Sequence, residues 1–458
     1  MKLFREPPCP RPQMYLLPPS VDQFVAPDAP VRVLDEVIDQ LDCSPFYAMY
    51  QGGGAPAYDP KTMFKVLVFG LWQGIRSSRK LEQALESDLR FMYLAQMSRP
   101  DFRTIARFRR QNVEAVKSLF AETVRLAQRM GLVLLEHAAV DGTKLEANVS
   151  GKRTYKTDRL NKTLDAVEEK IAALLQEAEE TDALEDEVHG QERGDEVPKA
   201  LRDLQRRKEL LTLAKEELEN SGRQSVAATD LQSRLMKTNA GNRPAYNAQA
   251  AVDAAEQIVV AADVTQEETD SAQLPSVVQS IQQNTGSTPE RTTADSGYWS
   301  ETSLAFAEER GLDAYVAYPG EYSDRKTGYT YQQEQDQFVG PAGEILPFYR
   351  ERVRREVTYR VYRLGRKELW VRQDGERAAR MRAKLITPQG RATYRLRQQI
   401  VEPVFGHLKG SFGLRRLLLR GLSGARIEFL LACAAHNLGK IARCQAAQPR
   451  LMPAAAAA

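Results

Sequence analysis

Cysteine is scarce in this chain, and a long apolar run is missing from it. The 458 residues include four cysteines without CxxC spacing, so neither a disulfide framework nor a zinc ribbon is predicted. The longest apolar run, 429–435, has seven residues, whereas a membrane-spanning helix needs about twenty. Prolines and charges interrupt the opening MKLFREPPCPRPQ, so no signal peptide is expected. We therefore expect a cytoplasmic protein that has no membrane partner.

Charge is divided unevenly along the chain, although the net charge is only +3. Residues 251–349 hold 4 basic and 17 acidic residues, whereas 350–450 hold 24 basic and 7 acidic ones. Aromatic residues lie at the edge of the second stretch and among its cations: Tyr349 directly before it, and Tyr359, Tyr362, Trp370 and Tyr394 within it. Such a stretch is typical of a polyanion-binding surface, because cations displace phosphate counterions and rings stack on bases. The alternative is that it pairs with the acidic stretch of the same chain.

The first third of the chain predicts a helical domain at 31–135, after a proline-rich, extended lead-in at 1–30. Asp101 can cap a short helix, DFRTIARFRRQN, which follows a turn. Three arginines share one face of this helix: Arg103, Arg107 and Arg110. One interpretation is a helix-turn-helix that presents them to DNA; the other is an exposed surface face.

Residues 136–450 have the element order of an α/β, ribonuclease H-like fold with a mixed sheet. Strands are expected at 136–144, 245–253, 258–265, 291–294 and 313–318, and helices at 274–283, 301–310, 395–410 and 422–444. Two insertions interrupt this domain. The leucine spacing of 151–235 predicts an antiparallel helical hairpin with its loop at 181–196, with a coiled-coil dimer as the alternative. Residues 320–385 are expected to be β-rich, and 451–458 to be a disordered tail.

Three carboxylates stand where this fold would bring them together. Asp141 lies in the first strand, Asp295 follows the fourth, and Glu402 lies on the helix after the fifth. Three such groups in one cavity repel one another unless cations neutralise them. Two Mg²⁺ ions, with Mn²⁺ as a substitute, would do so and would promote an in-line phosphoryl displacement.

Four local sequences make the predicted carboxylate site more specific than three acidic residues that coincide by chance. They are VDGTKLEANVS (140–150), PAYNAQAAVD (244–253), TADSGYWS (293–300) and YRLRQQIVEPVFGHLK (394–409). Together they resemble the DDE transposases of bacterial insertion sequences, in the group with a Tyr-x2-Arg-x3-Glu-x6-Lys signature. The resemblance covers roughly 55–450.

The resemblance implies a Mg²⁺-dependent enzyme that hydrolyses DNA phosphodiesters and transfers strands. Asp141, Asp295 and Glu402 would be its catalytic metal ligands, and Lys409 would contact DNA. The implied partners are double-stranded DNA, as terminal inverted repeats and as target, and further copies of the chain in a homodimer or higher oligomer. A ribonuclease H-like nuclease, or a non-catalytic DNA-binding protein derived from a transposase, is the alternative.

The signature is offset by one residue in this chain. Counted back from Glu402, its tyrosine and arginine positions fall on Arg395 and Gln398. The actual Tyr394 and Arg397 each lie one residue earlier. Arg395 shares a helix face with Glu402 and Lys409, seven residues to either side. We therefore predict Arg395 as the cation of the site, with Arg397 and Tyr394 reaching round as the alternative. Relatives often carry a cysteine cluster at 320–380; this chain has none there, so no zinc site is expected.

Other residues are weaker candidates for DNA contact. Lys144 and Asn148 are predicted phosphate contacts at the edge of the cavity. Tyr298 and Trp299 directly follow the second carboxylate and would stack on an extruded base, or else pack in the core. His407 is expected to contact phosphate at most.

Overall fold

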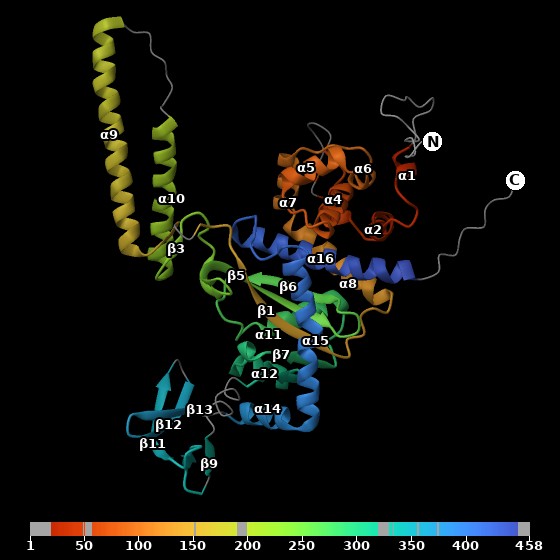
Figure 1. Cartoon of the computed structure of the whole chain (residues 1–458), viewed down its shortest axis with the longest axis vertical. Helices are drawn as coiled ribbons and strands as arrows, with labels where there is room; N and C mark the ends of the chain where they lie inside the picture. The colour runs from red at the N-terminus through yellow and green to blue at the C-terminus, as the bar shows by residue number, and fades with distance from the viewer. Residues whose placement is uncertain are drawn as a thin grey trace, which may run out of the picture.

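The computed structural model describes residues 20–48, 50, 57–150, 153–189, 199–318, 329–332, 334–354, 357–372 and 375–447. A mixed sheet lies at its centre (Figure 1). The N-terminal helices pack at one end, and a long helical hairpin and a small second sheet project away from the centre. The expected tail, 451–458, and most of the expected lead-in lie outside the described residues.

The N-terminal part is helical, as predicted. Its helices are α1 (Val21–Phe24), α2 (Pro30–Asp39), α3 (Ser44–Tyr47), α4 (Pro60–Trp72), α5 (Ser78–Ser87), α6 (Leu89–Leu94), α7 (Phe102–Gln111) and α8 (Val113–Arg129). The Asp101 side chain caps α7 by accepting the Thr104 amide at 2.7 Å. The expectation of an extended lead-in is wrong in its final part, because α1 lies within it.

The central sheet has the strand order β6-β5-β1-β7-β8. Its strands are β1 (Ala138–Glu146), β5 (Gly241–Asp253), β6 (Val259–Thr265), β7 (Arg291–Ala294) and β8 (Asp313–Val316). The β1, β5 and β6 pairings are antiparallel, while β7 and β8 run parallel to β1. Two helices follow its strands: α11 (Leu274–Thr285) and α12 (Glu301–Glu309). This topology confirms the ribonuclease H-like fold. An unforeseen strand, β4 (Arg234–Thr238), pairs with the start of β5.

Three C-terminal helices complete this fold: α14 (Glu376–Ile386), α15 (Pro388–Gly410) and α16 (Gly421–Ala447). The expected β-rich stretch at 320–385 is wrong at its end, where α14 lies. The helix expected from 395 begins at Pro388 instead, because the Thr387 hydroxyl caps it by accepting the Gly390 amide at 2.9 Å.

Both insertions follow the strands after which they were predicted. The first contains α9 (Thr157–His189) and α10 (Lys199–Ser221), which pack on each other as a hairpin around Leu160, Val167, Leu211 and Leu218. Because α9 extends to His189, the hairpin loop begins later than the predicted 181. The second insertion is an antiparallel sheet of β9 (Thr330–Gln332), β10 (Gln337–Val339), β11 (Ile345–Arg354), β12 (Val357–Leu364) and β13 (Lys367–Arg372).

One hydrophobic core joins the N-terminal helices to the central sheet. The helix α16 packs against α2, α4 and α8 and also against β6. A buried ion pair adds to this junction, with Arg76 Nη2 2.6 Å from Glu428 Oε2. Arg76 also donates to the carbonyls of Gly413 and Arg416, in the segment between α15 and α16. Among the described residues, no helix combines the length and apolar character that a bilayer span requires.

Candidate active site

Asp141 and Asp295 lie side by side because of the register of two parallel strands. In the pairing of β1 with β7, Val140 is opposite Ala294. Asp141 and Asp295 are the next residues along each strand, and β7 ends there while β1 continues. The sheet therefore brings together two carboxylates separated by more than 150 residues of sequence.

A guanidinium group from α15 lies against both aspartates. Arg397 Nη2 is 2.9 Å from Asp141 Oδ1 and 3.8 Å from Asp295 Oδ2. The Arg397 side chain is only 9% exposed. Burial raises the pKa of Asp141 to about 6; Arg397 opposes this rise, and the charge of Asp295 adds to it.

The structure places Arg397, and not Arg395, against the carboxylates. The buried face of α15 that packs on the sheet includes Thr393, Arg397 and Val401, whereas Arg395 is exposed. The preference for Arg395 as the cation of the site is therefore wrong, since the two residues from Arg395 to Arg397 turn the side chain by about 200° around the helix. A DNA contact by Arg395 or Tyr394 stays a prediction.

Glu402 is not brought into a ligand cluster with the two aspartates. It lies exposed on α15, and its side chain forms no hydrogen bond or ion pair with the described residues. In the part of the chain that the structure describes, no three His, Cys, Asp or Glu side chains are arranged to hold a metal ion. The role of Glu402 as third ligand stays a prediction.

The chemistry of the aspartate pair nevertheless fits a divalent cation. Carboxylate oxygens are the ligands that Mg²⁺ prefers. A positive group, the Arg397 guanidinium, already lies against both carboxylates in the structure. Asp141 and Asp295 thus offer hard oxygen ligands, and the position between them already accommodates a positively charged group.

A pocket rich in cations borders Asp141. Its lining includes Gly142, Thr143 and Glu146, and four basic side chains that we call the basic pocket residues: Lys144, Lys237, Lys409 and Arg415. Burial lowers the pKa of Lys409, and the neighbouring Arg415 lowers it further, whereas Asp141 opposes this change. A phosphodiester would relieve that repulsion, so the predicted DNA contacts Lys144 and Lys409 fit this position.

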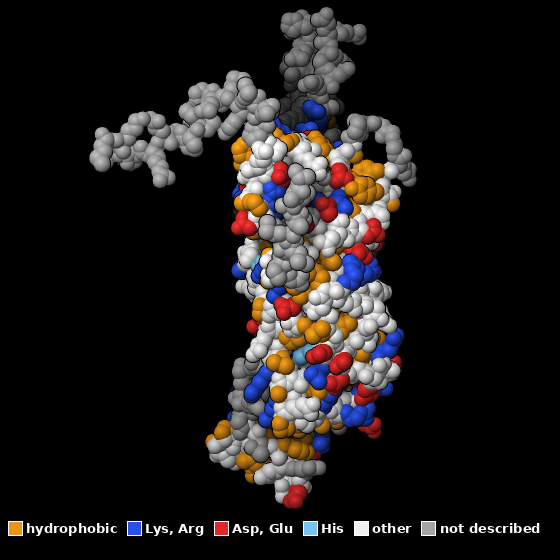
Figure 2. All heavy atoms as spheres, turned by 90° about the vertical axis from the view of Figure 1, so that its right-hand side faces the viewer, with side chains coloured by type: hydrophobic (Ala, Val, Ile, Leu, Met, Phe, Trp, Pro, Cys, Tyr) orange, Lys and Arg blue, Asp and Glu red, His pale blue; other side chains and the backbone are white. Residues whose placement is uncertain are grey.

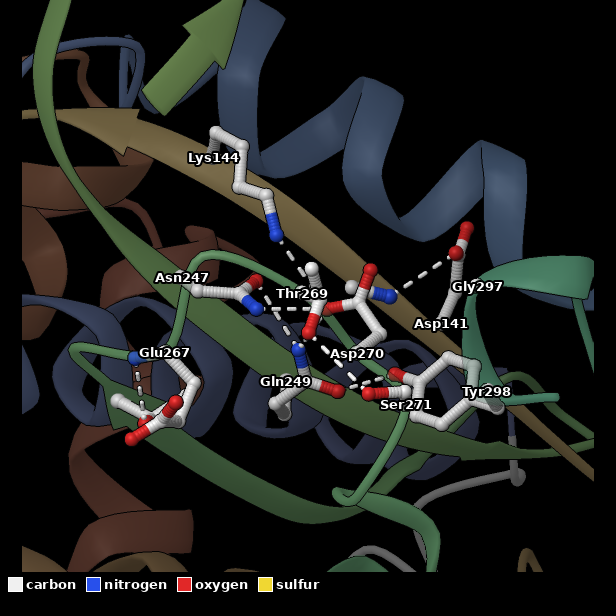
Figure 3. A network of polar contacts seen from close by, with 12 residues as sticks. Asp141, Lys144, Asn247, Gln249, Glu267, Thr269, Asp270, Ser271, Gly297 and Tyr298 are labelled. Carbon is white, nitrogen blue, oxygen red and sulfur yellow. Dashed lines mark hydrogen bonds and ion pairs between the residues drawn. The ribbon is translucent and has the colours of Figure 1, made fainter. Parts of the chain in front are cut away.

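A polar network beside Asp141 was missed by the sequence analysis (Figure 3). Asp270, on the segment before α11, accepts hydrogen bonds from Asn247 Nδ2 and Gln249 Nε2, both at 2.6 Å. Lys144 Nζ lies 3.3 Å from the same carboxylate. Asn247 and Gln249 are buried among the alanines of β5. Two polar residues within the largely apolar PAYNAQAAVD segment were the sequence signal for a buried polar network.

Tyr298 and Trp299 are packed in the core. Tyr298 is fully buried and donates its hydroxyl to Gln249. Trp299 is 5% exposed and packs edge-to-face with Tyr318, with ring centroids 5.0 Å apart. Of the two alternatives for these residues, this arrangement favours core packing over base stacking.

The remaining predicted DNA contacts lie away from the two aspartates. Arg103, Arg107 and Arg110 are exposed on α7, as a recognition face requires. The Asn148 side chain donates to the Leu418 carbonyl at 2.7 Å. His407 is hydrogen-bonded to a buried histidine of α16 and lines a groove with Trp72 and Phe412, so it does not join the aspartates.

Part of the basic C-terminal stretch pairs with the acidic stretch of the same chain. On α14, Arg377 and Arg380 contact Glu308, and Lys384 contacts Asp313 at 2.5 Å. On the face drawn in Figure 2, basic and acidic side chains accordingly lie side by side over the lower part. The alternative of internal pairing thus holds for α14. Of the basic pocket residues, Lys144 pairs with Asp270, whereas Lys237, Lys409 and Arg415 form no ion pair with the described residues.

Two family models match parts of this chain, and both describe transposase domains. A family model described as a transposase DDE domain matches residues 221–438, which include Asp295, Arg397 and Glu402. A second model, described as a transposase domain (DUF772), matches residues 19–111, which include most of the N-terminal helices. Asp141 lies outside both matched ranges. No curated protein matches the chain.

Proposed function

Because the chain belongs to the DDE transposases of insertion sequences, we propose that it cuts DNA at the ends of its element and joins the freed 3′-hydroxyl to target DNA. The observation that carries this proposal is the pair of Asp141 and Asp295, side by side on β1 and β7 and bordered by the basic pocket. Neighbouring carboxylates next to a phosphate-binding surface suit phosphoryl transfer.

Asp141 and Asp295, with Glu402 as the resemblance implies, would hold Mg²⁺, and Mn²⁺ should substitute. When bound, the metal supplies activation of the attacking oxygen and stabilisation of the leaving oxygen. The fit rests on the oxygen-only chemistry of these side chains and on the cation that lies against two of them.

The chain's own side chains neutralise charge and position DNA. Arg397 offsets the repulsion between the two aspartates, which would otherwise favour protonation of Asp141. Lys409, Lys144 and Arg415 would hold the phosphodiester backbone beside Asp141, since each provides a cation in the same pocket.

Recognition of the element ends is proposed to lie elsewhere. The exposed arginines of α7 form one basic face after a turn, which suits base contacts in a major groove. The proposal includes a homodimer or higher oligomer, since two ends must be held together during joining, and a cytoplasmic location.

The full-length protein can be assayed on duplexes that end in the DNA flanking its gene. We expect cleavage at the repeat boundary with Mg²⁺, none in EDTA, and joining of the 3′-ends to a supercoiled plasmid. A duplex with scrambled repeats is the matched control. Cleavage of both duplexes without joining would instead indicate a nuclease. Repeat-specific binding without cleavage would indicate a non-catalytic DNA-binding protein.

A further inference from the structure

Asp270 is lodged between the two segments that carry the paired aspartates. Its side chain is 17% exposed, and its Oδ1 atom accepts from Asn247, Gln249 and Lys144. Lys144 lies on β1, three residues after Asp141, and Asn247 and Gln249 lie opposite Lys144 and Gly142 on β5. Figure 3 shows these side chains converging on Asp270 from neighbouring strands.

Two glycines make room for this carboxylate. A Cβ atom on Gly142, which directly follows Asp141, would lie 2.6 Å from Asp270 Oδ1. A Cβ atom on Gly297, two residues after Asp295, would lie 3.1 Å from Asp270 Oδ2. Both distances are shorter than ordinary van der Waals contact. The backbone beside each aspartate therefore approaches the same side chain closely.

The network continues from Asp270 to the segment after Asp295. Gln249 donates to Asp270 through Nε2 and accepts the Tyr298 hydroxyl through Oε1. Tyr298 belongs to the 3₁₀ turn η2 (Ser296–Tyr298), which the Asp295 side chain caps by accepting the Gly297 amide at 2.9 Å. A continuous path of hydrogen bonds thus joins Lys144 on β1 to the turn that holds Asp295.

The Oδ1 atom of Asp270 is already satisfied by these partners. One oxygen accepts three donors, one of which is a lysine ammonium. A carboxylate in this state is a poor ligand for a metal ion, since binding would require it to give up these bonds. The same bonds suit it to hold other groups in place.

We propose that Asp270 is a positioning residue, which fixes the separation of Asp141 and Asp295 by holding β1, β5 and the turn after β7 together. This inference rests on the proposed function, because it assigns the two aspartates to metal binding. Ligands held at a fixed separation bind a cation without first paying the entropy of ordering. Loss of Asp270 should therefore weaken metal binding more than DNA binding.

Full-length Asp270→Ala and Asp270→Asn test this proposal, with Mn²⁺ alone as the probe. Electron paramagnetic resonance measures free Mn²⁺ during titration, without reliance on activity. For Asp270→Ala we expect a half-saturating Mn²⁺ concentration raised about tenfold or more, with DNA affinity in EDTA within about threefold of wild type. Asp270→Asn keeps one acceptor oxygen and should show a smaller rise. Glu268→Ala, at an exposed position on the same segment, is the matched control and should leave both values unchanged.

Gly142→Ala is an independent variant, because its new methyl group would clash directly with Asp270 Oδ1. Alone, it should raise the Mn²⁺ midpoint as Asp270→Ala does, because the new methyl group displaces the carboxylate. Combined with Asp270→Ala, it should add less than it does alone, since only its contact with Gln249 Nε2, at 2.7 Å, would remain. Circular dichroism and thermal unfolding establish that each variant is folded.

A folded Asp270→Ala protein with the wild-type Mn²⁺ midpoint would overturn this inference. Additive effects of Gly142→Ala and Asp270→Ala would overturn it too. A wild-type protein that neither binds Mn²⁺ nor cuts DNA would instead refute the proposed function. The two failures are therefore distinguishable.

Discussion

Arg397 Nη2 lies 2.9 Å from Asp141 Oδ1, so a nearly buried cation from α15 neutralises the carboxylate of the first strand. The same nitrogen is 3.8 Å from Asp295. A single guanidinium group thus compensates two adjacent negative charges. Without it, the Asp141 carboxylate, whose side chain is 17% exposed, would be left without a cation in a largely buried position, which is costly in a protein interior.

Replacement of Arg397 by alanine should lower the free energy of unfolding in EDTA by about 3 kcal/mol, because it leaves the buried Asp141 carboxylate uncompensated. Added Mg²⁺ should then stabilise the variant more than it stabilises wild type. Arg395→Ala is the matched control; the side chain is exposed, and its loss should change stability by less than about 0.5 kcal/mol. Urea unfolding measures both. Equal effects of the two substitutions would contradict the assigned ion pair.

The central sheet could be predicted because its strands are short apolar runs in an order that few folds share. The helix α14 could not, because it is densely charged and buries only Ala378 and Leu385. Two of its arginines, Arg377 and Arg380, pair with Glu301 and Glu308 of α12, which are far away in sequence. No local pattern in the sequence records such a pairing.

The paired aspartates were predicted from the fold, whereas their immediate partners were not. The sequence favours Arg395 over Arg397 because Arg395 shares a helix face with Glu402 and Lys409, and the two residues between the arginines turn a side chain by about 200°. Asp270 was missed because it lies in a polar segment and acts through buried amides of another strand. The contacts of Asp270 depend on the register between β1 and β5, which residue types alone do not reveal.

The basic pocket should dominate the salt dependence of DNA binding near the catalytic site. Each lost phosphate contact should reduce the slope of log affinity against log salt by about 0.9. We expect this change for Lys409→Ala and for Arg415→Ala. Arg380→Ala is the matched control, since this arginine is paired with Glu308 at 2.9 Å. DNA affinities measured across a series of salt concentrations give this slope for each variant. An equal change of slope for Arg380→Ala would place the DNA-binding surface on α14.

Specificity for the element ends should depend on the exposed face of α7. At least one of Arg103→Ala, Arg107→Ala and Arg110→Ala should cost about 1 to 3 kcal/mol on the terminal-repeat duplex, as loss of a base contact does. The scrambled duplex should lose less. Lys117→Ala, at an exposed position of α8, is the control. The full chain is required because the N-terminal helices share a core with α16.

Competition binding at matched salt measures this difference. Equal losses on both duplexes for all three arginines would show that they contact phosphate only. Specificity would then have to lie in another part of the chain.

Acid should destabilise the fold through His436. This buried side chain is hydrogen-bonded to the Gln257 carbonyl and to His407, and its cationic neighbours are Lys440 and Arg443. Burial lowers the pKa of His436 from 6.5 to about 4. The unfolded chain therefore takes up a proton as pH falls below 6.5, whereas the folded chain does not.

The stability contributed by neutral His436 is complete above pH 6.5 and falls between pH 6.5 and 4, by about 3 kcal/mol at most. In His436→Gln, the slope of unfolding free energy against pH in this window should decrease by about 1.4 kcal/mol per pH unit. Urea unfolding across the window measures the slope. An unchanged slope would show that other groups cause the acid sensitivity.

Asp141 and Asp295, with Glu402, should perform metal-dependent DNA cleavage. Its most direct measurement is the single-turnover cleavage rate on end-containing duplex with Mg²⁺ for Asp141→Asn, Asp295→Asn and Glu402→Gln, alongside DNA affinity. Asp263→Asn is the matched control, because this exposed aspartate pairs with Arg426 at the surface. We expect each of the three substitutions to lower the rate about 1,000-fold or more while affinity stays within a few-fold, and the control to cleave normally. Cleavage near the wild-type rate by Asp141→Asn or Asp295→Asn would contradict this expectation.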